Sequence, residues 1–223
     1  CGDPFWPSMN NNDGEAKTYT FIVKQEGETP VPPVAEPQDV TFKGLHDAQL
    51  AYLEVYSVGD DTKNLLEDVE RAADGYKYKY ETKLAAGDYI VKGYDADKSF
   101  NGSLVLTVEP GIKNEFKLQR VYQIYASNSG WALDEDYTLD VKLISADSQV
   151  RTIQLGKADC WGTVYASCIF MVGDTVEATV TPTEKHPGCL AATVKQTPEQ
   201  NCSISAKIEQ GHTLTVRAPQ GSV

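Results

Sequence analysis

The residues best suited to chemistry are the cysteines, and four of the five lie in the last third of the chain. Cys160 and Cys168 are eight residues apart, and Cys189 and Cys202 are thirteen apart. A structural zinc site would require more closely paired cysteines or nearby histidines. The four residues therefore predict two disulfide bonds, and with them an oxidising compartment.

The cysteine spacing leaves more than one disulfide pairing open. We expect Cys160–Cys168 with Cys189–Cys202, because Gly162 lets the chain turn between the first two and a turn at 197–201 follows the strand expected at 190–194. Two such local clasps would stabilise the fold by roughly 2–3 kcal/mol each. The competing pairing, Cys160–Cys189 with Cys168–Cys202, would link two sheets across a core.

No set of residues in the sequence forms a recognisable catalytic site. The histidines His46, His186 and His212 fall on segments that we expect to lie apart in the fold. The chain has no G-x-S-x-G nucleophile motif and no glycine pattern for nucleotide phosphates. The acidic run at 134–136 is typical of a solvated loop, and the loop from Asp95 lacks the glycine and glutamate of a calcium loop. We therefore expect a non-enzymatic protein without a metal or cofactor.

Two tryptophans, Trp131 and Trp161, are the candidates for ligand binding. Trp131 lies among the turn residues 128–132, and Trp161 lies at the tip of the hairpin expected after Cys160. An exposed indole ring can stack on a sugar or anchor a protein interface. The alternative is that each ring closes one end of a β-sandwich. The tyrosines of Tyr76–Tyr80 alternate on one strand face and are expected in the core.

The charge balance excludes several classes of partner. The chain has 223 residues and a formal net charge of −12, from 32 acidic and 20 basic residues. Binding to nucleic acid and to anionic lipid surfaces both depend on clustered Lys and Arg, so we expect no nucleic-acid partner. No apolar run reaches the length of about 18 residues that a membrane-spanning helix needs.

Short runs of β-forming residues, separated by turn residues, dominate the chain from residue 39 onward. Strands are expected at 76–80, 87–91, 103–108 and 114–118. The stretch Asn64–Arg71 has helical spacing and predicts one short helix on a loop. Regular short strands with turns between them predict an all-β protein built as a sandwich.

An internal repeat predicts the domain organisation. Ser103–Gly111 aligns with Ser203–Gly211, with apolar residues and a turn glycine at matching positions. The repeat favours two tandem antiparallel β-sandwich domains, at residues 39–119 and 120–223, the second holding both disulfides. Residues 1–17 are polar and are expected to form a flexible tether, and residues 18–38 a strand followed by a proline-rich linker.

Two stretches of the chain resemble known surface proteins. Cys1-Gly2-Asp3 and the polar residues after it resemble the start of a processed bacterial lipoprotein, a family whose first cysteine carries anchoring acyl chains. Leu84–Tyr94, with its L-x-A-G-x-Y pattern, and Phe100–Gly111 resemble a group of transthyretin-like (Ig-like) or fimbrillin-like β-sandwiches. These domains are common in surface lipoproteins of gut-dwelling Gram-negative anaerobes.

The resemblance implies a location and a function. It implies a protein held in the outer membrane by acyl chains on Cys1 and facing the cell exterior. Such lipoproteins often accompany TonB-dependent nutrient importers, which consist of a plugged barrel and a lid lipoprotein. The implied function is an accessory subunit that captures a glycan or peptide, or braces the complex. A fimbrial or adhesin subunit is the alternative.

The resemblance also implies a modification site. Asp174-Thr175-Val176 resembles the sites that some of these anaerobes O-glycosylate outside the inner membrane. Thr175 is therefore a candidate acceptor. The alternative is that Thr175 only occupies a position in a strand.

Overall fold

The structure is a computed structural model, and it describes residues 36–45, 49–74, 77–160 and 162–211. Several expected features lie outside the described residues. They are Cys1, the tether expected at 1–17, residues 18–35 of the strand and linker expected at 18–38, and Trp161. The regular elements of the described part are all strands, which confirms the all-β class. In sequence order they are β1 (Gln38–Leu45), β2 (Tyr52–Ser57), β3 (Arg71–Asp74), β4 (Lys77–Leu84), β5 (Gly87–Tyr94), β6 (Phe100–Val108), β7 (Asn114–Ala126), β8 (Tyr137–Ile144), β9 (Val150–Arg151), β10 (Ile153–Cys160), β11 (Thr163–Met171), β12 (Thr175–Pro182), β13 (Ala192–Gln196) and β14 (Cys202–Ala206).

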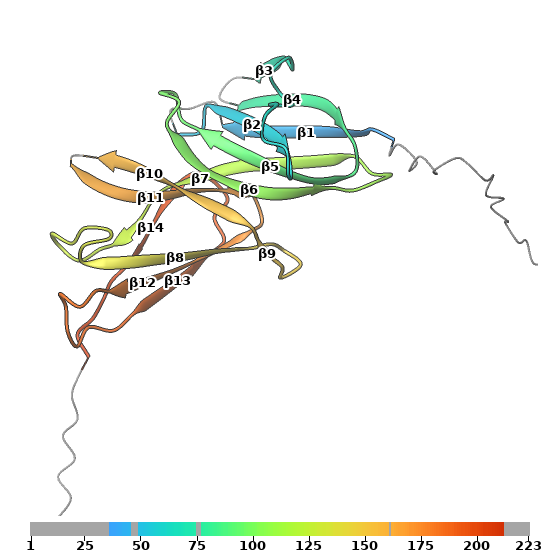
Figure 1. Cartoon of the computed structure of the whole chain (residues 1–223). Coiled ribbons are helices and arrows are strands. Elements are labelled where there is room, and N and C mark those ends of the chain that lie inside the picture. The colour runs from blue at the N-terminus through green and yellow to red at the C-terminus, as the bar shows by residue number, and fades with distance from the viewer. Residues whose placement is uncertain (1–35, 46–48, 75–76, 161, 212–223) are drawn as a thin grey trace, which may run out of the picture. The chain divides into compact units, whose positions relative to one another are not determined.

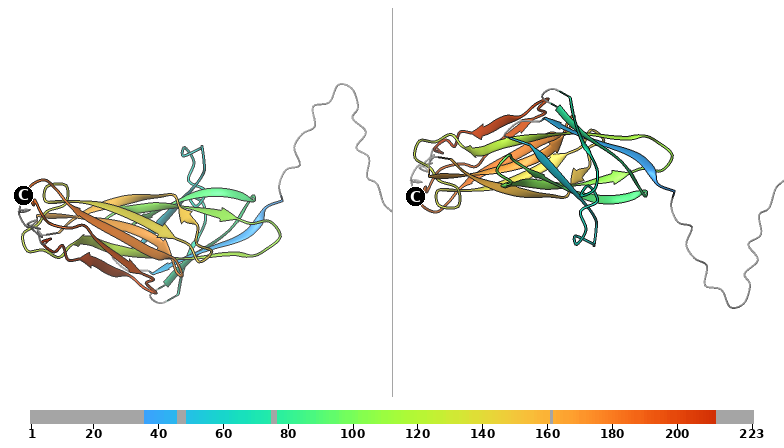
Figure 2. Two further views of the ribbon diagram at one scale, coloured as in Figure 1. Left: turned by 90° about the horizontal axis from the view of Figure 1, so that it is seen from below. Right: turned by 90° about the horizontal axis from the view of Figure 1, so that it is seen from above.

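The strands form two sheets. A 10-stranded sheet has the order β2-β5-β6-β10-β11-β7-β1-β4-β3, with β14 also paired to β7, and a 4-stranded sheet has the order β13-β12-β8-β9. In Figure 1, β1 to β6 gather on one side of the described part and β8, β12 and β13 on the other. Figure 2 shows the strands of both sheets running in roughly the same direction, as in an aligned sandwich.

The long sheet curls back on itself, so that its two ends enclose a core. Arg71 of β3, at one end, donates a hydrogen bond of 2.7 Å to the carbonyl oxygen of Ala51, just before β2 at the other end. The Arg71 guanidinium also lies 4.9 Å from the ring centroid of Tyr52. The two ends of the sheet therefore act as the two layers of a sandwich.

Strand β7 connects the two halves of this architecture. Its first residues pair in parallel with β1, at Val40↔Asn114 to Lys43↔Lys117. Its later residues pair in parallel with β14, at Cys202↔Val121 to Ala206↔Ala126. Strand β10 also connects the two halves. Its first residues pair with β6 and its later residues pair with β11, both antiparallel.

The division into two tandem domains is not confirmed. The boundary expected between 39–119 and 120–223 falls inside β7, and residues 35–223 form one compact unit. Strands expected in separate domains pair directly, as β6 does with β10. Strands β7 and β10 each pair with strands of both expected domains, so a domain boundary there would break hydrogen bonds of the sheet. A sequence repeat does not reveal that one strand belongs to both halves.

The core follows the alternation of the strands. In β12, Val176, Ala178 and Val180 are buried while the residues between them are not. In β4, Tyr78 and Tyr80 are buried, which confirms the expectation for these two tyrosines. Alternate side chains of a strand point to opposite faces, so each strand gives one face to the core.

The helix expected at 64–71 was wrong, because the segment forms turns instead. The side-chain oxygen of Asn64 accepts hydrogen bonds of 3.0 Å from the backbone N–H groups of Leu66 and Val55. Asparagine side chains that bond to nearby backbone favour turns over helix. In the described ranges we also find no helix that is long and apolar enough to cross a membrane.

Candidate functional site

The main candidate site is a groove on the outer face of β4, β1 and β7. Alternation places Val40 and Phe42 of β1 in the core. Lys43, the residue after Phe42, therefore lies on the outer face. The same period places Lys77 and Lys79 of β4, and Lys117 of β7, on that face. The groove has a volume of about 730 Å³. Its charged lining residues are Lys43, Lys77, Lys79, Lys113, Lys117, Glu81, Glu115 and Glu199.

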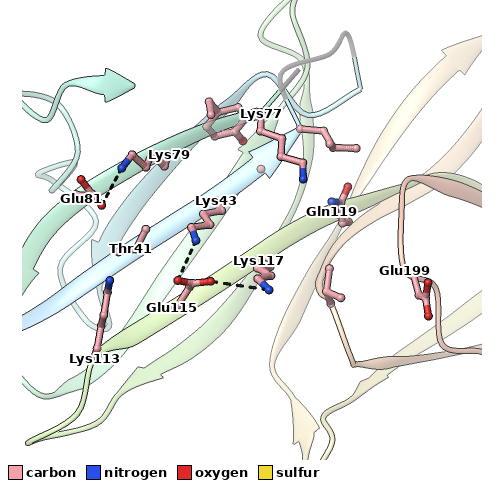
Figure 3. Close-up of a pocket in the computed structure, with 14 residues that line it drawn as sticks. Thr41, Lys43, Lys77, Lys79, Glu81, Lys113, Glu115, Lys117, Gln119 and Glu199 are labelled. Atoms are coloured by element: carbon pink, nitrogen blue, oxygen red, sulfur yellow. Dashed lines mark ion pairs between the residues drawn. The ribbon is translucent and has the colours of Figure 1, made fainter. Parts of the chain in front are cut away.

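Strand register aligns three of these lysines in one row. Lys79 of β4 is the partner of Lys43 of β1, and Lys43 is in turn the partner of Lys117 of β7. Neighbouring strands lie about 4.8 Å apart, so the three side chains leave the sheet side by side. We call Lys79, Lys43 and Lys117 the lysine row. Figure 3 shows them on three neighbouring strands.

Two glutamates partly neutralise the lysine row. Lys43 Nζ lies 2.9 Å from a carboxylate oxygen of Glu115, and Lys117 Nζ lies 3.9 Å from the other oxygen. Lys79 Nζ lies 3.0 Å from Glu81. The hydrogen bond from Lys43 holds the pKa of Glu115 below its ordinary value. Glu115 therefore stays ionised at neutral pH.

Two other lysines of the groove differ from the lysine row in their ion pairs. Lys77 and Lys113 form no ion pair with any residue that the structure describes. Glu199 lies apart from the three strands in Figure 3, and Leu45 and Val172 are apolar lining residues. Ammonium groups therefore outnumber carboxylates in the groove, on a chain whose net charge is −12.

A second cleft lies beside Trp131 and has a volume of about 450 Å³. Its lining includes Tyr125, Trp131 and Glu135, together with Gly162 and Tyr165 from the β10–β11 hairpin. Trp131 is half-buried, and one face of its indole ring is covered by His186 at a centroid distance of 3.8 Å. A sugar could therefore stack only on the remaining face.

The cleft is braced by Asp136. Its carboxylate accepts a hydrogen bond of 2.8 Å from the backbone N–H of Ala132 and lies 2.8 Å from His186 Nε2. The backbone bond from Ala132, followed by the contact with His186, holds the pKa of Asp136 below its usual range. The acidic run at 134–136, expected as a solvated loop, thus includes a carboxylate that orders the loop around Trp131.

The structure brings the regions of both predicted tryptophans together. Trp161 itself is not among the described residues, but its neighbours Gly162 and Thr163 line the same cleft as Trp131. The sequence placed the two tryptophans on separate loops. Their role in ligand binding stays a prediction.

The expected disulfides are not supported, since Cys168, Cys189 and Cys202 carry free thiols. Cys160 is the partner of Thr163 across the β10–β11 hairpin, and Cys168 lies five residues further along β11. At about 3.3 Å per residue, that separation exceeds the Cα spacing of about 5.5 Å that a disulfide needs. The physical reason is that the hairpin is a straight ladder and not a closed loop.

The second pair is separated in a similar way. Cys202 begins β14, whereas Cys189 bridges Gln210, beyond the other end of that strand. The competing pair is also apart, because Cys168 and Cys202 both register with Val121 of β7, which lies between their strands. Burial raises the pKa of Cys168 to about 12 and also raises that of Cys202.

Thr175 begins β12 and is half-buried. Its hydroxyl lies 2.7 Å from the hydroxyl of Thr197. O-glycosylation of Thr175 stays a prediction, and a glycan there would displace this contact. Its neighbour Asp174 is fully buried and pairs with Arg151 at 2.9 Å.

The lysine row was not anticipated from the sequence. The alternation in Tyr76–Tyr80 and in Lys113–Lys117 does place lysines on a solvent face. The adjacency of the two segments depends on β1, which pairs with β4 on one side and in parallel with β7 on the other. No local pattern reports that parallel pairing. Among the described residues we find no group of His, Cys, Asp and Glu side chains that could hold a metal ion.

Comparisons with known proteins give little further guidance. No protein-family model and no curated protein sequence match this chain. Among solved structures, the shaft pilin SpaA from Lactobacillus rhamnosus GG is similar at 12% identity and a TM-score of 0.25, covering 80% of this chain and 100% of that chain. A double mutant of the same pilin is similar at 10% identity and a TM-score of 0.25, covering 81% and 99%. The similarity is weak.

Proposed function

We propose that this protein is a non-enzymatic surface lipoprotein that captures a glycan or peptide for a TonB-dependent nutrient importer. The observation that supports ligand capture is the groove of about 730 Å³ on the outer face of β4, β1 and β7. The volume of this groove falls within the range usual for ligand-binding pockets.

The proposed anchor and partners rest on the sequence resemblance. Acyl chains on Cys1 hold the protein in the outer membrane, facing the cell exterior. The importer barrel and its lid lipoprotein are the proposed neighbours. The groove, on a face formed by strands hydrogen-bonded to one another, offers the importer a rigid capture surface.

The proposal is tested by purifying the protein from native membranes in mild detergent and identifying what travels with it. We expect a plugged-barrel importer at near-equal amounts. A Cys1→Ala variant should move to the soluble fraction, because acyl chains supply the membrane affinity, at about 0.8 kcal/mol per buried CH₂ group. Recovery as a ladder of self-polymers would overturn the importer function in favour of a fimbrial subunit.

A further inference from the structure

The lysine row places like charges directly opposite one another, which is an unfavourable arrangement in a sheet. Lys79 pairs with Lys43, and Lys43 pairs with Lys117, so two successive cross-strand pairs repel. The rest of the chain carries an excess of acidic residues. A concentration of lysines on one face of such a protein requires a physical explanation, and an anionic ligand supplies one.

We propose that the groove binds an acidic polysaccharide, with carboxylate groups of the sugar chain lying on the lysine row. This inference rests on the proposed function of ligand capture and names its ligand class. A carboxylate above Lys43 is flanked by the ammonium groups of Lys79 and Lys117, one strand away on each side. Such charge-assisted hydrogen bonds are stronger than neutral ones.

The ion pairs of the groove leave charge available for such a ligand. Five lysines line the groove against three glutamates. Glu115 is shared between Lys43 and Lys117, at 2.9 and 3.9 Å. These pairs are solvent-exposed, so each contributes little and is readily exchanged for a ligand carboxylate.

The neighbouring row distinguishes a polysaccharide from a phosphate-rich ligand. Glu81 and Glu115 flank Thr41 in the next row along the strands. That row lies two residues away, or about 7 Å from the lysine row. Carboxylates repel a second anionic group but accept hydrogen bonds from hydroxyls. A ligand that alternates carboxylates with hydroxyl donors satisfies both rows, and a polyphosphate does not.

The groove also lacks the features by which sheets bind peptides. Peptides commonly add a strand to a free sheet edge, but β1, the floor of the groove, is hydrogen-bonded on both sides. Leu45 and Val172 are the apolar side chains offered by the lining, since Tyr78, which also lines the groove, is buried. The groove therefore fits a polar chain laid across a sheet face.

The test measures binding of polygalacturonate and of neutral dextran to the full-length protein in detergent, by calorimetry. We expect polygalacturonate to bind and dextran not to bind. The double variant Lys43→Gln with Lys117→Gln should weaken binding at least tenfold. The matched control, Lys142→Gln with Lys195→Gln, removes the same charge from exposed lysines that pair with Glu177 of β12. It should leave binding unchanged.

Each outcome decides the inference separately from the proposed function. Equal losses in both double variants would show a general charge effect and would overturn the site. Poly-glutamate binding as tightly as polygalacturonate, with the same lysine dependence, would overturn the polysaccharide class. Absence of polygalacturonate binding, in a protein that still co-purifies with an importer barrel, would reject the inference and leave the proposed function standing.

Discussion

The indole ring of Trp131 stacks on the imidazole ring of His186, with 3.8 Å between ring centroids and 18° between ring planes. Trp131 lies before β8 and His186 lies after β12, so the stack ties together two loops that are distant in sequence. The loops meet because β8 and β12 are paired from Tyr137↔Pro182 onward. The stack therefore closes the end of the smaller sheet.

Removing the stacked imidazole should destabilise the fold. For His186→Ala we expect the free energy of unfolding to fall by about 0.5–1.5 kcal/mol, the usual range for an aromatic pair. Denaturant unfolding followed by circular dichroism measures the change. His186→Phe keeps a ring over Trp131 but loses the contact with Asp136, so it should recover only part of the loss. Equal losses in the two variants would show that the stack contributes nothing.

The carboxylate of Asp136 should make stability depend on pH at acidic values. Its pKa in the folded protein is lowered, first by the N–H of Ala132 and then by His186. A lowered folded pKa stabilises the fold above the unfolded pKa of about 3.9, and the contribution is lost as pH falls through the folded value. The unfolding free energies of wild type and Asp136→Asn should therefore differ at neutral pH and converge below about pH 4. A gap that stays constant as the pH falls further below that value contradicts the prediction.

The ion pair between Asp174 and Arg151 should be sensitive to truncation. The Asp174 side chain is 0% exposed, and it receives bonds of 2.9 and 3.1 Å from Nε and Nη2 of Arg151. Asp174→Ala leaves the guanidinium without its partner, and we expect a loss of about 3–5 kcal/mol. Lys142→Ala breaks exposed pairs at 3.9 Å and should cost under about 1 kcal/mol. Chemical denaturation of both variants provides the comparison.

The described cysteines should differ in reactivity. Cys168 is buried and its pKa is raised to about 12, so little thiolate forms at neutral pH. Burial also raises the pKa of Cys202, while Cys189 is half-buried at the β12–β13 connection. In native protein we expect iodoacetamide to label Cys189 first, Cys202 more slowly and Cys168 after unfolding. Peptide mapping without reductant gives the order, and a Cys189–Cys202 bridge would contradict it.

Gly156 should tolerate no larger side chain. It lies where β10 passes from β6 to β11, and a Cβ atom there would lie 2.4 Å from the carbonyl carbon of Asn101. Gly156→Ala should therefore cost about 3 kcal/mol or more through backbone displacement. Gly59 has a φ of +90° and open space around it, so Gly59→Ala should cost only the left-handed strain of about 1–2 kcal/mol. Thermal unfolding distinguishes steric overlap from strain, and equal costs would contradict the steric account.

The sequence by itself determined the elements and the faces of the strands. Alternation placed Tyr78 and Tyr80 in the core, and the turn residues at Glu109-Pro110-Gly111 separate β6 from β7 as expected. These features are local, because a strand needs only its own period of two to assign a side chain to one face. The same local reasoning failed at Asn64, whose side-chain oxygen accepts two backbone hydrogen bonds that favour a turn.

Only the tertiary structure decided which strands are neighbours. The lysine row exists because β1 lies between β4 and β7, and the second of these pairings is parallel and distant in sequence. The separation of Cys168 from Cys202 has the same origin, since β7 runs between their strands. Alternation predicts which face of a strand is buried but not which strands lie beside it. The order of the strands depends on burying all the apolar faces at once.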